Sequence, residues 1–498
     1  MPARALGLLA ALLLFAAALL VAHDLITEAP PTYEPVVAET ALNRRPIAGA
    51  GRSLDAAECT GLPQRWIVIG WDGAGWDRIL PMLDEGRLPH LATLMREGSH
   101  GNLYGFRPSL SPALWTTVAT GVSPDVHGVR GFDKRKHRLL RRWERIRRLG
   151  RIERSLYTNA DREVRALWNL LSDAGRDSLV VGYHNTFPAE VVEGAVVSNY
   201  LVQARMATLM RSNTRLPERF ASSLIHPPDL LDEVLALERE TRGRMPAELG
   251  RFVDFTAAEF QAFIDQPRTL DDPASRRRYH LEQAWVFDTF HAETATRLYA
   301  RLDPDLMLLH FQSVDIASHN FLYYDAPEFR DAGGLEPQVV EELEYDRAPF
   351  NRTVGAFYDY LDDWLGRLLE LRDDSTAVML LSDHGFESAL EDDGGGRHDD
   401  APPGILVLQG PGIVHGRIDD ATLYDILPTL LTSMDLPLSE ELEGRPLRSA
   451  FCDDAWEQFA HRKVPSYEGE QRFVPHIEPP DEIRDAIEER LRSLGYVQ

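Results

Sequence analysis

Six residues that could hold metal ions occur in this sequence in short motifs. Asp315 and His319 are four residues apart, so on a helix they would share one face and could coordinate a single ion. Asp383 and His384 form a second pair, and Gly385 after them suits a tight turn. Mixed carboxylate and imidazole ligation is typical of Zn²⁺, with Mn²⁺ as the alternative. The candidate ligands are Asp72, Asp315, His319, Asp383, His384 and His398.

Each motif alone also has an ordinary structural explanation. An Asp that follows a strand, such as Asp72, is common, and Asp315 with His319 could form a surface hydrogen bond. His398 lies in a glycine-rich stretch and would mean little by itself. Together, three Asp and three His that mostly follow predicted strands favour a metal centre.

Apolar runs that alternate with helical segments must position these side chains. The predicted helices are Leu80–Glu97, Val164–Ala174, Tyr279–Leu302 and Thr353–Leu371. The predicted strands are Arg65–Trp71, Ser178–Tyr183, Ala195–Ser198, Leu306–Phe311, Ala377–Ser382 and Gly404–Leu408. Continuous apolar strands between helices indicate an α/β fold, with a mostly parallel central sheet and helices on both faces. In such sheets ligands bind beyond the carboxyl ends of the strands, where Asp72 and Asp383 are expected.

Length and composition limit the class of protein. The chain has 498 residues, of which 44% are hydrophobic and 26% charged, and this excludes a disordered, collagenous or coiled-coil protein. The net charge of −25 disfavours nucleic-acid binding, which needs a basic face, and we find no nucleic-acid-binding motif. An excess of carboxylates favours solubility and suits hard metal ions.

The N-terminal segment, residues 1–25, predicts export. Arg4 precedes an apolar run of 18 residues, Ala5–Ala22, which is the pattern of a signal peptide. A run of this length also borders on a membrane anchor, and a buried core helix is the plain alternative. We therefore expect a protein that is either anchored in the membrane by this segment or released as a periplasmic or secreted protein.

One catalytic domain is expected between two extensions. Residues 26–62 are rich in Ala, Pro, Glu and Thr and predict a linker, residues 63–455 form the α/β domain, and residues 456–498 extend its C-terminus. Cys59 and Cys452 are the only cysteines, and an even pair in an exported chain predicts a disulfide bond. Two unrelated buried thiols are the alternative.

Three segments have the character of helical insertions that could cap the site, near residues 133–160, 201–273 and 325–352. The first contains Lys134–Arg154, which has 11 Lys or Arg against 2 Glu and apolar residues at helical spacing. It predicts a surface helix that pairs with acidic parts of the same chain. The alternative is an amphipathic helix that contacts anionic lipid headgroups or a polyanionic substrate.

The ordered motifs resemble the alkaline phosphatase superfamily, most closely its type I phosphodiesterase/nucleotide pyrophosphatase-like branch. The resemblance covers most of residues 65–450. Beside the metal motifs it rests on Pro108–Gly121, Pro124–Gly128, Leu167–Gly175, Tyr183–Pro188, Gly410–Ile413, Tyr424–Thr429 and Gly444–Leu447. It implies an alkaline phosphatase-like fold, two divalent metal ions, usually zinc, and a covalent nucleophile. The implied ligand sets are Asp315, His319 and His398 for one ion, and Asp72, Asp383 and His384 for the other.

Ser111 is the nucleophile that the resemblance implies. Counting back from Thr120 and Gly121 places it at the family's nucleophile position, with its oxygen beside the second ion. Ser109 is the nearest rival, and a helix N-cap is the plain interpretation of Ser111. The implied reaction passes through a phosphoseryl intermediate that water hydrolyses, and the helix N-terminus after Ser111 would donate to phosphate oxygens.

Departures from the family pattern narrow the substrate. Leu114 stands where nucleotide pyrophosphatases usually carry an Asn that contacts phosphate, which weakens the expectation of a nucleotide. Pro112 directly follows Ser111 and Trp115 takes the position of the sulfatase Arg, which argues against a formylglycine sulfatase.

We therefore expect an exported two-metal phosphoric ester hydrolase that prefers diesters and acts on a small molecule or a lipid headgroup. A phosphomonoesterase or headgroup phosphotransferase of the same superfamily is the first alternative, and a non-catalytic binding protein the remote one. His184 and Asn185 could point into the site. Structural or supporting roles suit His127 and His310 better than metal ligation.

Overall fold

A computed structural model describes residues 32–36, 40–44, 61–137, 152–210, 218–267, 270, 272–325, 349–388, 396–398, 400–468, 477 and 479–493. The predicted signal or anchor segment, residues 1–25, and Cys59 lie outside the described residues. Among the helices that are described, none is long and apolar enough to span a membrane.

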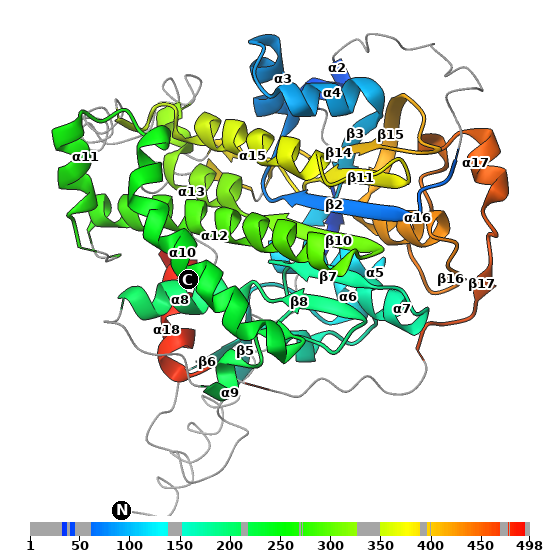
Figure 1. Cartoon of the computed structure of the whole chain (residues 1–498), viewed down its shortest axis with the longest axis horizontal. Helices are drawn as coiled ribbons and strands as arrows, with labels where there is room; N and C mark the ends of the chain where they lie inside the picture. The colour runs from blue at the N-terminus through cyan, green and yellow to red at the C-terminus, as the bar shows by residue number, and fades with distance from the viewer. Residues whose placement is uncertain are drawn as a thin grey trace, which may run out of the picture.

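A nine-stranded sheet forms the centre of the molecule, in the order β15-β3-β14-β11-β2-β10-β7-β8-β9 (Figure 1). Its strands are β2 (Arg65–Trp71), β3 (Ser99–Tyr104), β7 (Ser178–Val181), β8 (Gly194–Val197), β9 (Ile225–His226), β10 (Leu306–Phe311), β11 (Thr376–Leu381), β14 (Gly404–Gln409) and β15 (Gly416–Thr422). β14 and β9 pair antiparallel with their neighbours, while β2, β7, β8, β10 and β11 pair in parallel, as do β3 and β15. The predicted α/β fold with a mostly parallel sheet is therefore confirmed.

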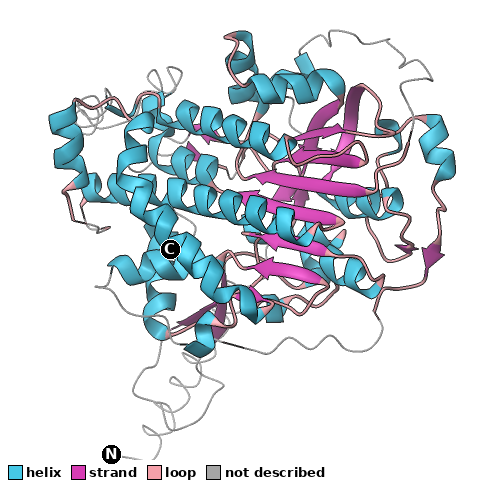
Figure 2. Cartoon of the chain, in the orientation of Figure 1, coloured by secondary structure: helices cyan, strands magenta, loops and turns pink. Residues whose placement is uncertain are grey.

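Side chains of the central strands alternate between two hydrophobic cores, one on each face of the sheet. In β2, Ile67 and Ile69 pack into the first core, whereas Trp66 and Val68 pack into the second. Because successive strand residues point to opposite faces, a strand that is apolar throughout needs helices on both sides. Figure 2 shows this layering. Helices α12 (Pro273–Leu302), α13 (Ser313–Asp325) and α15 (Thr353–Leu369) cover the first face, and α5 (Ser111–Thr120), α7 (Leu167–Asp173) and α16 (Ile426–Ser433) cover the second.

The helix predicted over Leu80–Glu97 is in fact two helices, α3 (Trp76–Asp84) and α4 (Pro89–Glu97). Between them Gly86 has φ +77° and Leu88 has φ 55°, both outside the helical region. Pro89 then starts α4, because its fixed φ suits the first helical turn and disfavours a helical residue before it.

The first predicted insertion is not a helix at its two ends. β5 (Asp133–His137) and β6 (Ile152–Leu156) pair antiparallel, so the pairing of two distant segments overrides the helical spacing of the apolar residues. Residues 138–151 lie outside the described residues, as do residues 326–348 of the third insertion. The second insertion is mainly helical, as predicted, with α8 (Tyr200–Met210), α9 (Glu218–Ala221), η4 (Pro228–Leu230), α10 (Leu231–Glu248), η5 (Leu249–Phe252) and α11 (Ala257–Ile264), but it also supplies the edge strand β9 of the central sheet.

Both extensions contact the domain. Within the predicted linker, β1 (Glu34–Pro35) pairs with β4 (Phe106–Arg107), and α2 (Ala41–Arg44) follows Thr40, which donates a hydrogen bond to Asn102 Oδ1 at 3.0 Å. Helix α17 (Asp453–Gln458) crosses the expected boundary between the domain and the C-terminal extension. The extension also contains β17 (Lys463–Val464), which pairs with β16 (Leu438–Ser439), and α18 (Asp481–Ser493), which packs against α8. Cys452 is disulfide-bonded, but the pairing with Cys59 stays a prediction. The remaining short elements are η3 (Asn159–Asp161), α6 (Pro124–His127), β12 (Glu387–Ser388), β13 (Gly396–Arg397), η7 (Leu423–Asp425) and η8 (Arg448–Ala450).

Candidate metal centre

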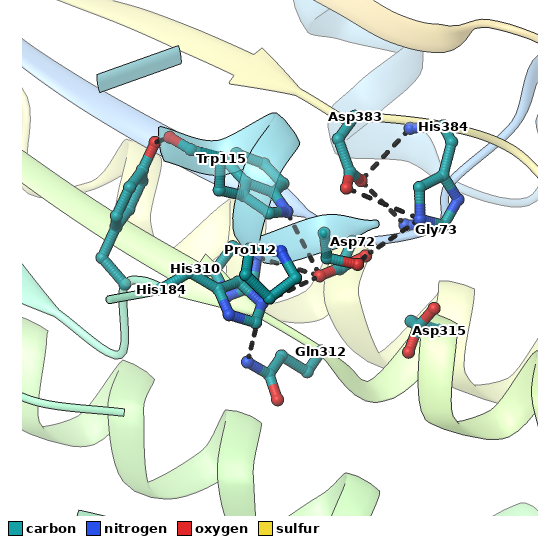
Figure 3. A network of polar contacts seen from close by, with 12 residues as sticks. Asp72, Gly73, Pro112, Trp115, His184, His310, Gln312, Asp315, Asp383 and His384 are labelled. Atoms are coloured by element: carbon teal, nitrogen blue, oxygen red, sulfur yellow. Dashed lines mark hydrogen bonds and ion pairs between the residues drawn. The ribbon is translucent and has the colours of Figure 1, made fainter. Parts of the chain in front are cut away.

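Most of the predicted ligands converge where three neighbouring parallel strands, β11, β2 and β10, end. Asp72 directly follows β2, and Asp383 and His384 follow β11, which pairs with β2. Asp315 and His319 lie in α13, which begins just after β10 on the other side of β2. Because these strands run in one direction, their carboxyl ends bring residues from distant parts of the chain together (Figure 3).

The first ligand group consists of Asp72, Asp383 and His384. Each offers one ligand atom, and these atoms lie within 4.8 Å of one another. His384 Nε2 is 3.6 Å from Asp72 Oδ1 and 3.5 Å from Asp383 Oδ2. Although both are buried, His384 Nε2 and Asp383 Oδ2 make no hydrogen bond. Buried polar atoms without hydrogen bonds are costly, so this pair fits a cation that both would coordinate.

The second ligand group contains Asp315, His384 and His398, whose ligand atoms also lie within 4.8 Å of one another. His319 stands beside it, with Nε2 at 3.5 Å from Asp315 Oδ1 and its ring centroid 5.0 Å from that of His398. The rings of His384 and His398 stack at 4.2 Å. His384 therefore lies between the two groups, whereas the sequence placed it in the first alone.

A third group surrounds the other oxygen of Asp72. His184 Nε2 lies 3.4 Å and His310 Nε2 3.3 Å from Asp72 Oδ2, and Trp115 donates its indole N–H to the same atom at 3.2 Å. From the sequence alone, His184 was only a minor candidate for the site and His310 a supporting residue. The signal that could have found them is position, because His184 follows β7 and His310 lies in β10, the two strands next to β2 on that side. Trp115 is one helical turn after Ser111.

The electrostatics of the centre favour bound cations. Burial and the charges of Asp72 and Asp315 raise the pKa of Asp383 well above its usual value. Burial alone would raise the pKa of Asp72 too, but the nearby imidazoles of His184 and His310 hold it well below the usual range. Several buried carboxylates at one place repel each other unless cations neutralise them.

The histidine at the far side of the centre has the protonation state that a metal ligand needs. Burial, with the nearby His384 and His319, holds the pKa of His398 well below its usual value. His398 is therefore a neutral imidazole at physiological pH, which is the metal-binding form. The mixed carboxylate and imidazole donors thus fit divalent ions of the zinc or manganese kind.

Ser111 is the first residue of α5 and is turned toward this centre. Its hydroxyl donates to Asp72 Oδ1 at 3.4 Å and is fully buried. Leu110 holds the N-cap position, and no side chain caps the helix, so the N-cap interpretation of Ser111 is wrong. Ser109 instead donates to the carbonyl oxygen of Phe106 at 3.5 Å.

The N-terminus of α5 offers fewer donors than the sequence suggested. Pro112 has no N–H, and the amides of Ala113 and Leu114 both bond to the carbonyl of Leu110, at 2.8 and 3.1 Å. The backbone N–H of Ser111 makes neither of these two bonds. An anion at this end of the helix would therefore depend on metal ions and side chains more than on the helix backbone.

The loop after β7 fixes the position of α5. Asn185 donates to the carbonyl of Pro112 at 3.0 Å and to Thr116 Oγ1 at 2.9 Å. Tyr183 donates to the carbonyl of Trp115 at 2.8 Å. These bonds hold the helix that carries the candidate nucleophile against the sheet. His127 contacts Thr117 on the same helix, with 3.1 Å between Nε2 and Oγ1, and burial lowers its pKa to about 3, consistent with a structural role.

A buried carboxylate holds the helix that carries Asp315 and His319. Asp288 lies in α12 and accepts the backbone N–H groups of Gln312, at 2.8 Å, and Ser313, at 3.0 Å. These amides belong to the start of α13, where helix N–H groups have no partner within the helix. Burial raises the pKa of Asp288 to about 7. No motif in the sequence indicated this residue.

The family model of Type I phosphodiesterase / nucleotide pyrophosphatase matches residues 66–406. The chain belongs to this family. The matched range contains all six candidate ligands and Ser111, and it includes the strands β2, β10 and β11 that position them. The chain is thus a phosphodiesterase-like member of a family of metal-dependent phosphoester hydrolases.

Curated relatives of this phosphodiesterase-family chain are similar over part of their length. The 2,3-bisphosphoglycerate-independent phosphoglycerate mutase of Haloarcula marismortui is 26% identical over 253 residues, which are 48% of this chain and 43% of the mutase. The mutase of the same name from Cereibacter sphaeroides is 34% identical over 104 residues, 20% of each chain. The chain thus matches less than half the length of these curated relatives.

Some solved structures are similar to this chain over most of its length. Wild-type alkaline phosphatase PafA is 11% identical with a TM-score of 0.47, and the match covers 79% of this chain and all of PafA. Murine ectonucleotide pyrophosphatase / phosphodiesterase 5 is 12% identical with a TM-score of 0.40, covering 75% of this chain and 95% of the murine protein.

Proposed function

We propose that the protein is a two-metal phosphodiesterase in which Ser111 attacks phosphorus. The observation that carries the proposal is the place of Ser111. Its Oγ lies 3.4 Å from Asp72 Oδ1, and Asp72 is at the same time a member of a buried carboxylate and imidazole cluster. A nucleophile beside a cation site is the arrangement that phosphoryl transfer needs.

Two divalent ions, which we propose to be zinc, would be held by the first and second ligand groups. Asp72, Asp383 and His384 suit one ion, and Asp315, His319 and His398 the other, with His384 within reach of both groups. When bound, such ions supply Lewis acidity, which lowers the pKa of a coordinated hydroxyl and neutralises developing charge on the phosphate.

The protein's own groups orient the nucleophile. Because the pKa of Asp72 is held well below its usual range, Asp72 stays a carboxylate. It accepts the hydrogen bond from Ser111 but does not act as the general base that removes the Ser111 proton. In the proposed reaction the Ser111 hydroxyl loses its proton to solvent, Oγ forms a bond to phosphorus while the bond to the leaving ester oxygen breaks, and that oxygen takes up a proton from solvent. Water then replaces Ser111 at phosphorus, and Ser111 regains its hydroxyl proton.

The substrate is proposed to be a small or lipid-headgroup phosphodiester rather than a nucleotide. Leu114 is completely buried in the second hydrophobic core, so this position offers no polar contact to a phosphate. A preference for diesters over monoesters follows from the family and is part of the proposal.

Hydrolysis of matched aryl phosphate mono- and diesters tests the proposed function. We expect diester cleavage that a chelator abolishes and zinc restores. Ser111→Ala should lower kcat/KM by a factor of about 10³ or more while the metal content stays unchanged. Ser109→Ala is the matched control and should retain activity. Undiminished hydrolysis by Ser111→Ala would show that another group attacks.

Phosphoryl transfer to an alcohol is a second candidate, favoured by the mutases among the relatives. A phosphoseryl intermediate can pass its phosphoryl group to a hydroxyl as well as to water. Glycerol in the assay would distinguish the two. A hydrolase releases phosphate and aryl alcohol in equal amounts from a monoester, whereas a transferase releases less phosphate and forms glycerol phosphate.

Export is also part of the proposal, on the basis of Arg4 and the apolar run Ala5–Ala22. The basic segment 134–154 would pair with acidic parts of the same chain, as Lys134 does with Asp161, and contact of its remaining basic residues with anionic lipid headgroups is the alternative. Fractionation of cells that express the full chain tests export, and recovery of the protein in the cytosolic fraction alone would contradict it.

A further inference from the structure

One aromatic side chain contacts all three candidate histidine ligands. Phe386 lies two residues after His384, and the centroids of these two rings are 5.8 Å apart. The centroid of the Phe386 ring is also 5.0 Å from that of His319 and 5.5 Å from that of His398. The three pairs of ring planes meet at 63°, 83° and 86°, which is the edge-to-face arrangement that aromatic rings favour. Phe386 therefore packs against imidazoles of both ligand groups.

A short hairpin places Phe386 opposite His398. Strands β12 and β13 pair antiparallel, with Glu387 opposite Arg397. Phe386 directly precedes β12 and His398 directly follows β13, so the two residues occupy the next pair of opposite positions. Side chains that stand opposite each other on neighbouring strands lie close together. The pairing of the backbone thus sets the ring of Phe386 against the histidine that follows the hairpin.

Two glycines leave the space that the ring fills. Gly73, directly after Asp72, has φ +76°, and a Cβ at this position would lie 2.6 Å from Phe386 Cε2. A Cβ at Gly396 of β13 would lie 2.8 Å from Phe386 Cδ1. Carbon atoms that are not bonded to each other pack at about 3.5–4.0 Å, so neither position has room for a side chain. The ring is therefore held between the loop that carries Asp72 and the hairpin.

The orientation of an imidazole ring decides whether it can coordinate an ion. The lone pair of a ring nitrogen lies in the plane of the ring, so rotation of the ring turns the lone pair away from the ion. Groups that contact a ligating histidine from behind commonly fix this orientation. His384 has one such contact, because its Nδ1 lies 2.9 Å from the carbonyl oxygen of Gly385. A rigid ring that meets three imidazoles edge to face can orient them as well.

We propose that Phe386 is a positioning residue of the metal centre, whose ring fixes the orientation of the three imidazoles before ions bind. Ligands that are already oriented need no further ordering when the ion arrives. The effect should be largest for the ion held by His319 and His398, since both of these ligands contact the ring. The other ion has His384 alone among the histidines, and Gly385 also holds that side chain. The inference rests on the proposed two-metal function and adds a residue that supports its centre.

Zinc binding to the metal-free full chain tests the inference without depending on turnover. Phe386→Met keeps an apolar side chain in the same space but replaces the rigid ring with a flexible chain. We expect it to weaken the ion held by His319 and His398 about tenfold, and the other ion by less than about threefold. Competition with a fluorescent zinc chelator measures both dissociation constants. Asp383→Ala, which lacks a ligand of the other ion, shows which constant belongs to which ion.

Two further variants separate the ring from ordinary packing. Phe386→Tyr keeps the ring and should retain both dissociation constants. Phe255→Met is the matched control, because Phe255 is also partly buried against the first hydrophobic core and its ring packs on Phe263 and Phe350. It should leave zinc binding unchanged.

Denaturation of the metal-free proteins shows what the ring contributes to packing alone. A lower free energy of unfolding of Phe386→Met with unchanged dissociation constants would overturn the inference, because the ring would then serve packing only. Weakening of zinc binding by Phe386→Tyr or Phe255→Met to the same extent would overturn it too. These outcomes leave the proposed function standing, whereas a wild type that binds no zinc would contradict the proposed function and the inference together.

Discussion

The buried carboxylate of Asp288 makes stability depend on pH in a defined direction. Burial raises the pKa of Asp288 from 3.8 to about 7, although the carboxylate accepts two backbone hydrogen bonds at the start of α13. Between these two pH values the folded chain holds a proton that the unfolded chain has released. The free energy of unfolding contributed by this residue therefore falls as the pH rises from about 4 to 7, and it is constant above that.

The magnitude follows from the two pKa values. Moving the pKa from 3.8 to about 7 corresponds to a loss of about 4 kcal/mol across this range. Asp288→Asn has no proton to release. The difference between the unfolding free energies of the wild type and the variant should therefore decrease by about that amount from pH 4 to pH 8. Chemical denaturation of the metal-free proteins at several pH values measures it.

Two pH curves that run parallel would refute this reasoning, because they would show that Asp288 has the same pKa in the folded and unfolded chains. A second readout tests whether Asp288 positions the ligand helix. We expect Asp288→Asn to weaken zinc binding about tenfold, since α13 carries Asp315. Asp362→Asn is the matched control. Asp362 accepts the amides of His90 and Leu91 at the start of α4, which carries no candidate ligand.

Two further substitutions have defined expected outcomes. Trp115→Phe removes the indole N–H that donates to Asp72 Oδ2 and should lower kcat/KM about tenfold at nearly unchanged Tm. Trp168→Phe is the control, because it removes a comparable indole hydrogen bond to the carboxylate of Glu190, and it should retain activity. Equal losses of kcat/KM in the two variants would show that Trp115 does not position Asp72. Gly182→Ala should destabilise the fold by about 1–3 kcal/mol, measured by denaturation, because φ is +70° and the new Cβ would lie 2.5 Å from His291 Nδ1. An unchanged denaturation midpoint would mean that His291 can move aside.

The sequence predicted the central strands well because they are buried on both faces. β2 and β10 begin and end at the predicted residues, since a continuous apolar run has few alternatives to a buried strand. The strands β3 and β15 were not predicted, because their sequences, SHGNLY and GRIDDAT, are polar. Asn102 of β3 lies inside the protein all the same, where Thr40 and Asn43 of the N-terminal extension pair with its side chain.

The direction of β14 could not be predicted from its apolar pattern. The apolar pattern of a fully buried strand is the same whether the strand runs parallel or antiparallel to its neighbours. β14 in fact pairs antiparallel with both β11 and β3. The helix expected over Lys134–Arg154 failed for a related reason. Local spacing favoured a helix, but β5 and β6 satisfy each other's backbone groups through a pairing that spacing does not reveal.

The ligand motifs were predictable because each follows a strand or opens a helix, so local sequence marks them. The structure brings all six candidate ligands and Ser111 to one end of the sheet. Asp288 was not predictable, because it lies within the long helix α12 and its importance depends on where α13 begins. The contacts of His184 and His310 with Asp72 likewise depend on strand order, which the sequence alone leaves open.

Metal content tests the central claim most directly. The full chain, purified without chelator and dialysed against micromolar zinc, is analysed by mass spectrometry of its metals beside the variant Asp383→Ala. We predict about two divalent ions per chain for the wild type and about one fewer for the variant. A wild-type protein that retains no metal, or a variant that retains as much as the wild type, would contradict the assignment of these buried carboxylates and histidines to a two-metal centre.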